Sequence, residues 1–116
     1  LGLASASFIE ENAAALAVWV KAQDFAVEQI LTDPEKAAES VAVEVGVSTD
    51  EARAQFGGLT YLRASEQAGD DWLGKKLGED LLATATFLLG QDGISAVAPA
   101  ATYSDGVHAA AAASVK

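Results

Sequence analysis

Large apolar residues recur at helical spacing through the first quarter of the chain. They fall every three or four positions, on one side of a helix of about six turns: Ile9, Leu16, Trp19, Val20, Val27 and Ile30. Ser7 and Glu10 have the spacing of a capping box that would open this helix. Asp33 precedes Pro34, and a residue before proline is pushed away from helical dihedrals. The pattern predicts one long amphipathic helix between these signals.

A short helix is predicted next, from Pro34 to about Val45, because proline is well placed in the first turn of a helix. Gly46 would end it as a C-terminal cap. Small and β-branched residues form its predicted inner face: Ala37, Ala38, Val41, Ala42 and Val45.

A third helix is predicted to open at a second capping box, Ser48 to Glu51. Ala52 and Phe56 would face inward, and Gly57-Gly58 would end the helix. The residues that follow, 59–62, are β-prone and flanked by glycine and polar positions, which indicates an extended connector or one small strand.

The second half of the sequence predicts a helical turn over 65–68 and then a second long amphipathic helix. Its apolar positions are Trp72, Leu73, Leu77, Leu81, Leu82, Ala85, Leu88 and Leu89. Gly74 and Gly78 weaken this helix by roughly 1 kcal/mol each relative to alanine, and Gly90 and Gly93 end it. Residues 94–103 are predicted to be a loop around Pro99. Asp105 would then cap an alanine-rich helix running toward Val115.

These elements indicate a predominantly α fold of about five to six helices with at most one or two short strands. Residues 1–5, LGLAS, have the character of the tail of a buried strand. A chain of 116 residues is the size of one domain. We therefore expect a single helical segment over residues 1–116 with one core.

Composition narrows the possible functions. Seven Lys and Arg against seventeen Asp and Glu give a net charge of -10, which disfavours nucleic acid and anionic membrane surfaces as partners. No apolar run approaches the ~20 residues of a membrane span, and no signal peptide is visible. The sequence contains no cysteine, which excludes disulfides and thiolate chemistry, and no methionine. We expect from the missing methionine that the chain was cut from something longer or is numbered from a processed end.

Catalytic and metal-binding patterns are not evident in the sequence. His108 has no acid or hydroxyl partner at a recognisable spacing, so we expect it to be solvated or to pack. Most carboxylate pairs fall in predicted first turns, where the helix dipole favours negative charge. We therefore predict no catalytic residues, no metal ligands and no cofactor, and expect that the protein is not an enzyme. Loss of turnover on replacing His108 would revive that possibility.

Tyr61 and Trp72 are the candidate ligand-binding residues. They flank a short connector, and aromatic residues near helix starts often line small-molecule clefts. The assignment rests on residue type, and the alternative is that both are ordinary core anchors. The same two interpretations hold for Tyr103.

Several segments resemble, in order, the C-terminal part of periplasmic substrate-binding proteins of ABC importers, in the taurine, aliphatic sulfonate and nitrate class. They are TDPEKAAESVA, VEVGVSTDEA, LTYLRASEQAGDDWLG, ATATFLLGQDGIS and TYSDGV, and they span nearly the whole chain. The family's proline-rich tail after the last segment is replaced here by alanines.

The resemblance implies a two-lobed α/β parent protein, of which this chain would be the helical C-terminal part of lobe one. It implies a periplasmic or extracytoplasmic location, a small sulfonate or related anion as ligand, and no bond-breaking step. The implied partners are the missing N-terminal portion of the parent and the membrane subunits of the importer. The ligand's identity, the contacting residues and the oligomeric state stay open.

A different class of function also fits the pattern. A free-standing helical protein that assembles with copies of itself would use the same apolar stripes for self-association, because exposed hydrophobic faces seek partners.

Overall fold

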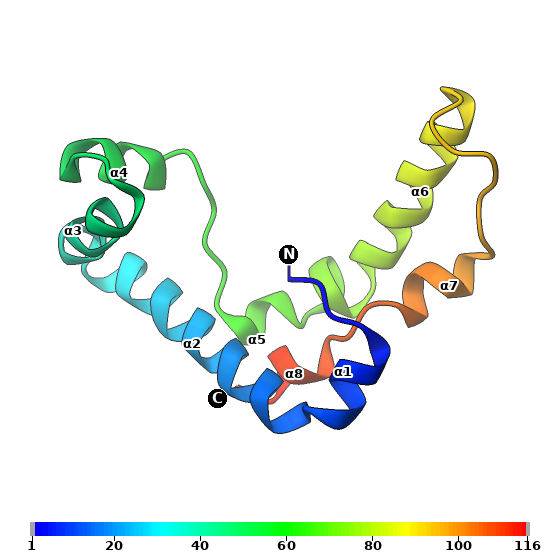
Figure 1. Cartoon of the computed structure of the whole chain (residues 1–116), viewed down its shortest axis with the longest axis horizontal. Coiled ribbons are helices and arrows are strands. Elements are labelled where there is room, and N and C mark those ends of the chain that lie inside the picture. Colours follow the sequence, from blue (N-terminus) through cyan, green and yellow to red (C-terminus); the bar gives the residue numbers. More distant parts are fainter. Residues whose placement is uncertain (1, 116) are drawn as a thin grey trace. The chain divides into compact units, whose positions relative to one another are not determined.

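The computed structural model describes residues 2–115, which form helices joined by short connectors with no β-strand in that range (Figure 1). The predicted predominantly α character is therefore confirmed. Eight α-helices and one π-helical turn lie within the described residues, more than the number expected. The chain divides into two compact units, residues 2–64 with Val115 and residues 65–114. The predicted single helical segment with one core over residues 1–116 stays a prediction. No helix in the described range has the length and apolarity to cross a bilayer.

The first predicted long helix is interrupted at Asn12, giving α1 (Ala6–Glu11) and α2 (Ala13–Thr32). Asparagine is one of the poorer helix formers, and here it leaves helical dihedrals at φ -127° and ψ 34°. The capping box predicted at Ser7 is wrong. Ser5 caps the helix instead, since its Oγ accepts from the Phe8 N–H at 3.2 Å.

The expectation of a strand tail at residues 1–5 is wrong for its described part. Residues 2–5 have no regular structure, and Leu3 is 98% exposed. A strand must pair its backbone groups with a neighbour, and the described residues offer no strand to pair with. Leu1 lies outside the described residues.

The two short helices form as predicted, as α3 (Pro34–Val45) and α4 (Thr49–Phe56). Asp33 Oδ1 accepts from the Lys36 N–H at 3.2 Å. Gly46 adopts the left-handed conformation, with φ 77°, that favours glycine. The Ser48–Glu51 capping box is complete, with both reciprocal hydrogen bonds present.

Alanines form the buried centre of the first unit. Ala38 and Ala42 of α3 meet Ala52 of α4, and Val41, Val47 and Phe56 pack partly buried around them. Ala37 is buried as predicted, but Val45 is 62% exposed, so its assignment to the inner face is wrong. Ala42 is the last buried residue of α3, and the valines after it, Val43 and Val45, are exposed.

The chain between α4 and α5 (Ala64–Gln67) is an extended connector, which decides between the two structures predicted for residues 59–62. The helical turn predicted over 65–68 is present as α5, one residue earlier.

The second predicted long helix is also interrupted. It begins as a wide turn, η1 (Asp70–Gly74), and continues as α6 (Lys76–Gly90). The N–H groups of Trp72 and Gly74 both donate to the Gly69 carbonyl, at 3.0 and 2.9 Å, and Trp72 leaves helical dihedrals. A Cβ on Gly74 would lie 2.9 Å from two backbone carbonyl oxygens. Only glycine fits there, so this residue shapes the turn. The predicted helix end at Gly90 is confirmed.

The C-terminal residues form two short helices, α7 (Ala100–Asp105) and α8 (Ala110–Ala113). Asp105 is the last residue of α7, so its predicted role as the cap of a long final helix is wrong. His108 lies exposed in the connector between the helices and not within a helix. Gly106 and the residues after it separate the two alanine runs.

Gly78 sets the contact between α6 and α7. It is buried, and a Cβ at this position would lie 2.9 Å from the Cα of Ser104. The helices approach so closely only because glycine has no side chain. Gly90, at the other end of α6, has no atom within 4 Å of an added Cβ.

Gly78→Ala and Gly90→Ala form a matched pair that tests this packing. Helix propensity alone favours both substitutions by up to about 1 kcal/mol. We expect Gly90→Ala to be neutral or stabilising, and Gly78→Ala to lower the free energy of unfolding by roughly 1–3 kcal/mol because it forces α6 from α7. Urea denaturation followed by circular dichroism measures both. Equal effects of the two substitutions would contradict the proposed close contact.

Candidate functional site

A shallow groove in the first unit contains one of the two predicted ligand-binding residues, Tyr61. We call it the Tyr61 groove. The end of α2, the start of α3, the end of α4 and the following connector line it, through Ile30, Leu31, Pro34, Glu35, Arg53, Phe56, Gly57, Leu59, Thr60 and Tyr61. The Tyr61 ring meets the Phe56 ring edge to face, with centroids 5.9 Å apart and planes at 84°. This arrangement is the favourable one for aromatic pairs.

The walls of the Tyr61 groove are mainly apolar, and its charge is balanced. Arg53 pairs with Glu35, and both side chains are more than half exposed. An exposed ion pair of this kind contributes little to stability, and the carboxylate offsets the cation toward an approaching anion. The groove is therefore suited to an apolar or aromatic group more than to an isolated anion.

An ionic cluster around the buried Asp24 fastens the connector that carries Tyr61 to α2. We call it the Asp24 clamp, formed by Asp24, Glu28, Arg63 and Ala64. Asp24 Oδ1 accepts from Arg63 Nε at 2.9 Å and from the Ala64 N–H at 2.7 Å, and its Oδ2 accepts from Arg63 Nη2 at 2.6 Å. Glu28 lies one turn further along α2, 3.3 Å from Arg63 Nη1. Asp24 is only 6% exposed and is buried with its hydrogen bonds made.

The clamp strongly favours the ionised carboxylate. The Arg63 hydrogen bond, followed by the Ala64 N–H, lowers the pKa of Asp24 from 3.8 to about 2, although burial acts in the opposite direction. The same bond raises the pKa of Arg63. Asp24 is therefore ionised at neutral pH, and the ionised form is the one that the clamp stabilises.

Sequence reasoning missed the clamp, although α2 carries a signal for it. Asp24 lies four residues after Val20 and three before Val27, so it falls on the apolar side of the predicted helix. A carboxylate there needs a partner. Nothing in the sequence around Arg63 indicates that the partner lies 39 positions away.

The other two aromatic candidates, Trp72 and Tyr103, lie in the second unit. Trp72 belongs to η1 and is half exposed. Its neighbour Leu73 lines a second, small-residue hollow between η1, α6 and α7. Tyr61 and Trp72 thus belong to different units, and neither unit alone brings them together. Their role in ligand binding stays a prediction. Tyr103 is partly buried, and its Oη accepts from the Ala98 N–H at 3.2 Å.

Within residues 2–115, no group of three or more His, Cys, Asp and Glu side chains is placed to hold a metal ion. No protein-family model matches the chain, and neither a curated protein nor a solved structure is significantly similar to it. The site is thus characterised by its own geometry, an aromatic groove beside a buried clamp.

The clamp predicts a specific loss of stability in acid. Because the folded pKa of Asp24 lies below its ordinary value, the stabilisation is fully present above about pH 4 and is lost as the pH falls through about 2. Carboxyl carbon NMR should show Asp24 titrating near 2, and Arg63→Met should raise that pKa.

Comparison of Asp24→Asn with the wild type isolates the effect. Asp24→Asn should flatten the change in unfolding free energy between pH 4 and 2. A carboxyl pKa near 4 for Asp24 would contradict the clamp.

Proposed function

We propose that this chain is the helical C-terminal part of an extracytoplasmic solute-binding protein that captures a small sulfonate such as taurine, or a related anion, for an ABC importer. The complete protein would be a two-lobed α/β fold whose lobes close around the ligand. Such closure is a hinge motion driven by the ligand's preference for the closed state, and no bond is broken.

The large accessible surface of the chain is the observation on which the proposal rests. A compact monomer of 11.8 kDa exposes about 5,900 Å², and two separate compact bodies of half that mass about 7,100 Å² together. This chain exposes 8109 Å². Two units that do not touch would expose at least this area, so the units taken by themselves together expose more than two compact bodies of their size. Such an excess of exposed surface is expected when the apolar sides of the helices pack against another part of the protein, which this chain does not contain.

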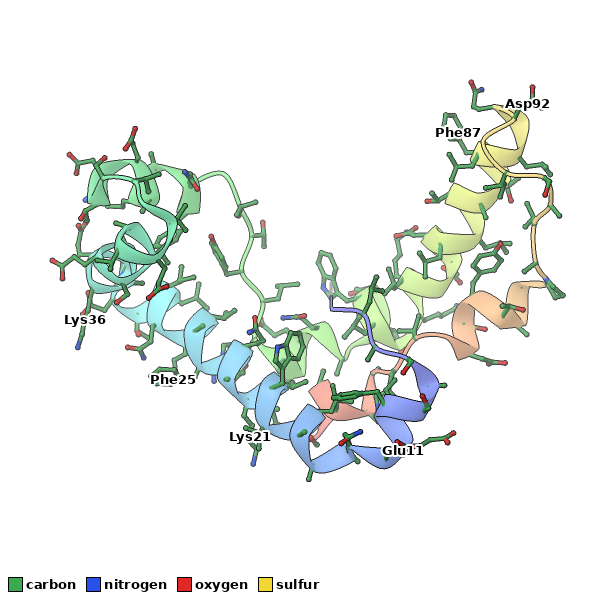
Figure 2. All side chains as sticks on the ribbon, viewed as in Figure 1. Glu11, Lys21, Phe25, Lys36, Phe87 and Asp92 are labelled. Carbon is green, nitrogen blue, oxygen red and sulfur yellow. The ribbon has the colours of Figure 1, made fainter. Side chains whose placement is uncertain are left out.

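The nature of the exposed residues supports the same conclusion. No large side chain among the described residues is fully buried, whereas Phe25 on α2 and Phe87 on α6 are 60% and 65% exposed (Figure 2). The last three turns of α6, residues 81–90, contain no charged residue, yet three of the leucines predicted to face inward are exposed: Leu81, Leu88 and Leu89. The two threonines of this segment, Thr84 and Thr86, donate their hydroxyls to carbonyls one turn earlier. A helix segment that is mostly apolar and has no charge on any side is normally buried.

The segments that carry the resemblance coincide with junctions between helices. TDPEKAAESVA contains the α2–α3 junction, and VEVGVSTDEA contains the end of α3 and the capping box of α4. Short, sharply capped helices of this kind suit a chain that wraps one side of a sheet.

The positive charge for an anionic ligand would come from the rest of the parent protein. Arg53 and Arg63 are both paired with carboxylates, and the whole chain has a net charge of -10. Tyr61 and Trp72 would then supply apolar or aromatic contacts to the ligand rather than its counter-charge.

A thermal-shift measurement on the full-length parent tests the ligand. Taurine or a short alkanesulfonate should raise the melting temperature, because a ligand that binds only the folded state stabilises it by mass action. The matching amine without the sulfonate should have no effect. A gene product that consists of this chain alone, with no upstream α/β region, would contradict the proposal.

Phe87→Glu tests whether α6 is covered in the parent. In the isolated chain we expect a loss of unfolding free energy within about 0.5 kcal/mol, as for other exposed positions. In the parent the loss should exceed about 2 kcal/mol, because a charge would enter an apolar contact. Ala52→Glu, at the buried centre of the first unit, should be severe in both. Equal costs of Phe87→Glu in the two proteins would argue against coverage of this face.

Self-assembly is the second candidate, and the same exposed apolar side chains favour it. An evolved assembly would show one defined stoichiometry in sedimentation equilibrium, and added salt would tighten it by screening the net charge of -10 on each copy. Phe25→Lys or Phe87→Lys would dissociate it. Irregular, open-ended association would instead be the behaviour of a helical part without its sheet.

A further inference from the structure

The connector between α4 and α5, residues 57–63, runs from the C-terminal end of α4 to the ionic contact at Asp24. At its start, the Gly58 and Leu59 N–H groups donate to carbonyls of the last turn of α4, each at 3.2 Å. At its end, Arg63 and the Ala64 N–H bind the Asp24 carboxylate. Between these points the segment has no regular structure, and Tyr61 rests edge-on against Phe56.

Two glycines stand at the start of this connector without a steric reason. A Cβ on Gly57 or Gly58 would meet its nearest atom at 3.6 and 3.7 Å, which is ordinary contact, and neither residue has a positive φ. Gly74 and Gly78 differ, since a Cβ there would lie 2.9 Å from backbone atoms. Glycines that the closed geometry does not require add conformational freedom to the chain. In this connector the two glycines, and hence the most flexible backbone, lie at the end far from the Asp24 clamp.

We propose that residues 57–63 form a strap, hinged at Gly57-Gly58 and latched by Asp24 on Arg63 and Ala64, that opens as a unit and so removes one wall of the Tyr61 groove. The latch is the ionic end and the glycine pair is the flexible end. α3 and α4 stay folded while the strap opens, because their alanine contact does not involve it. This device is independent of the sulfonate-binding proposal.

Fluorine NMR of the full chain labelled with 3-fluorotyrosine tests the strap, because the protein contains two tyrosines and only Tyr61 lies on it. Asp24→Asn keeps the shape of the side chain and removes its charge. We expect the Tyr61 resonance to move toward that of free fluorotyrosine as the Phe56 contact is lost, with the Tyr103 resonance unchanged. Asp50→Asn, an exposed aspartate in α4, is the matched control and should move neither.

Limited proteolysis with thermolysin, with the cut sites located by mass, gives a second readout. Asp24→Asn should raise cleavage within 57–63 at least tenfold and leave α3 and α4 uncut. Gly57→Ala with Gly58→Ala should slow the wild-type cleavage about two- to fivefold for each substitution, since each limits the open state. This second variant keeps the test valid if Asp24→Asn unfolds the unit.

Three results would overturn the strap. Cleavage of α3 and α4 in the wild type at the same rate as 57–63 would mean that the unit opens as a whole. An unchanged Tyr61 resonance in Asp24→Asn, or faster cleavage after the glycine substitutions, would mean that there is no latch or no hinge.

Discussion

The helices of both units meet through alanine and glycine, and this constraint determines how much the chain can bury. Ala38, Ala42 and Ala52 form the centre of the first unit, and Gly78 allows α6 to contact α7 in the second. Small residues let helix axes approach closely, but a buried methyl-sized group contributes about 0.8 kcal/mol against about 1.5–3 kcal/mol for a leucine or phenylalanine. The contacts are therefore specific in geometry and modest in energy, and the large apolar side chains stay outside.

Because the apolar core contributes little, the stability of the first unit depends more on the buried polar contact of Asp24. Asp24 joins α2 to a segment 39 positions later in the chain, through three hydrogen bonds to one carboxylate. Removing one partner of such a contact leaves an uncompensated charge, which costs more than an exposed ion pair contributes. Exposed pairs such as Lys76 with Asp80, one turn apart on α6, have no comparable consequence. The first unit thus depends on one ionic contact to place the connector that carries Tyr61.

Local signals were sufficient to predict α3 and α4 but not the interruptions of the long helices. Pro34, Gly46 and the Ser48 box act through their own backbone neighbours, so the sequence indicates where these two helices begin and end. The break at Asn12 and the turn at Gly74 arise from competition between apolar periodicity and weak helix formers, and periodicity alone cannot decide it.

The candidate site was predictable only in part, for a similar reason. The aromatic residues Tyr61 and Phe56 are visible in the sequence, but the contact of Asp24 with Arg63 depends on tertiary structure. The expected strand was wrong for residues 2–5, because a strand depends on a partner that the described residues do not provide.

Charge helps to decide which kind of surface covers the exposed apolar sides. A second copy brings its own net charge of -10 toward the first and loses translational and rotational freedom on association. The sheet of the proposed parent would be held nearby by covalent linkage at a high effective concentration, and its surface could be uncharged. Residues 81–90 of α6, which are free of charge, would match such a surface better than another acidic chain. Under this proposal, small-residue contacts would suffice within each unit, since most of the apolar burial would come from contacts with the sheet.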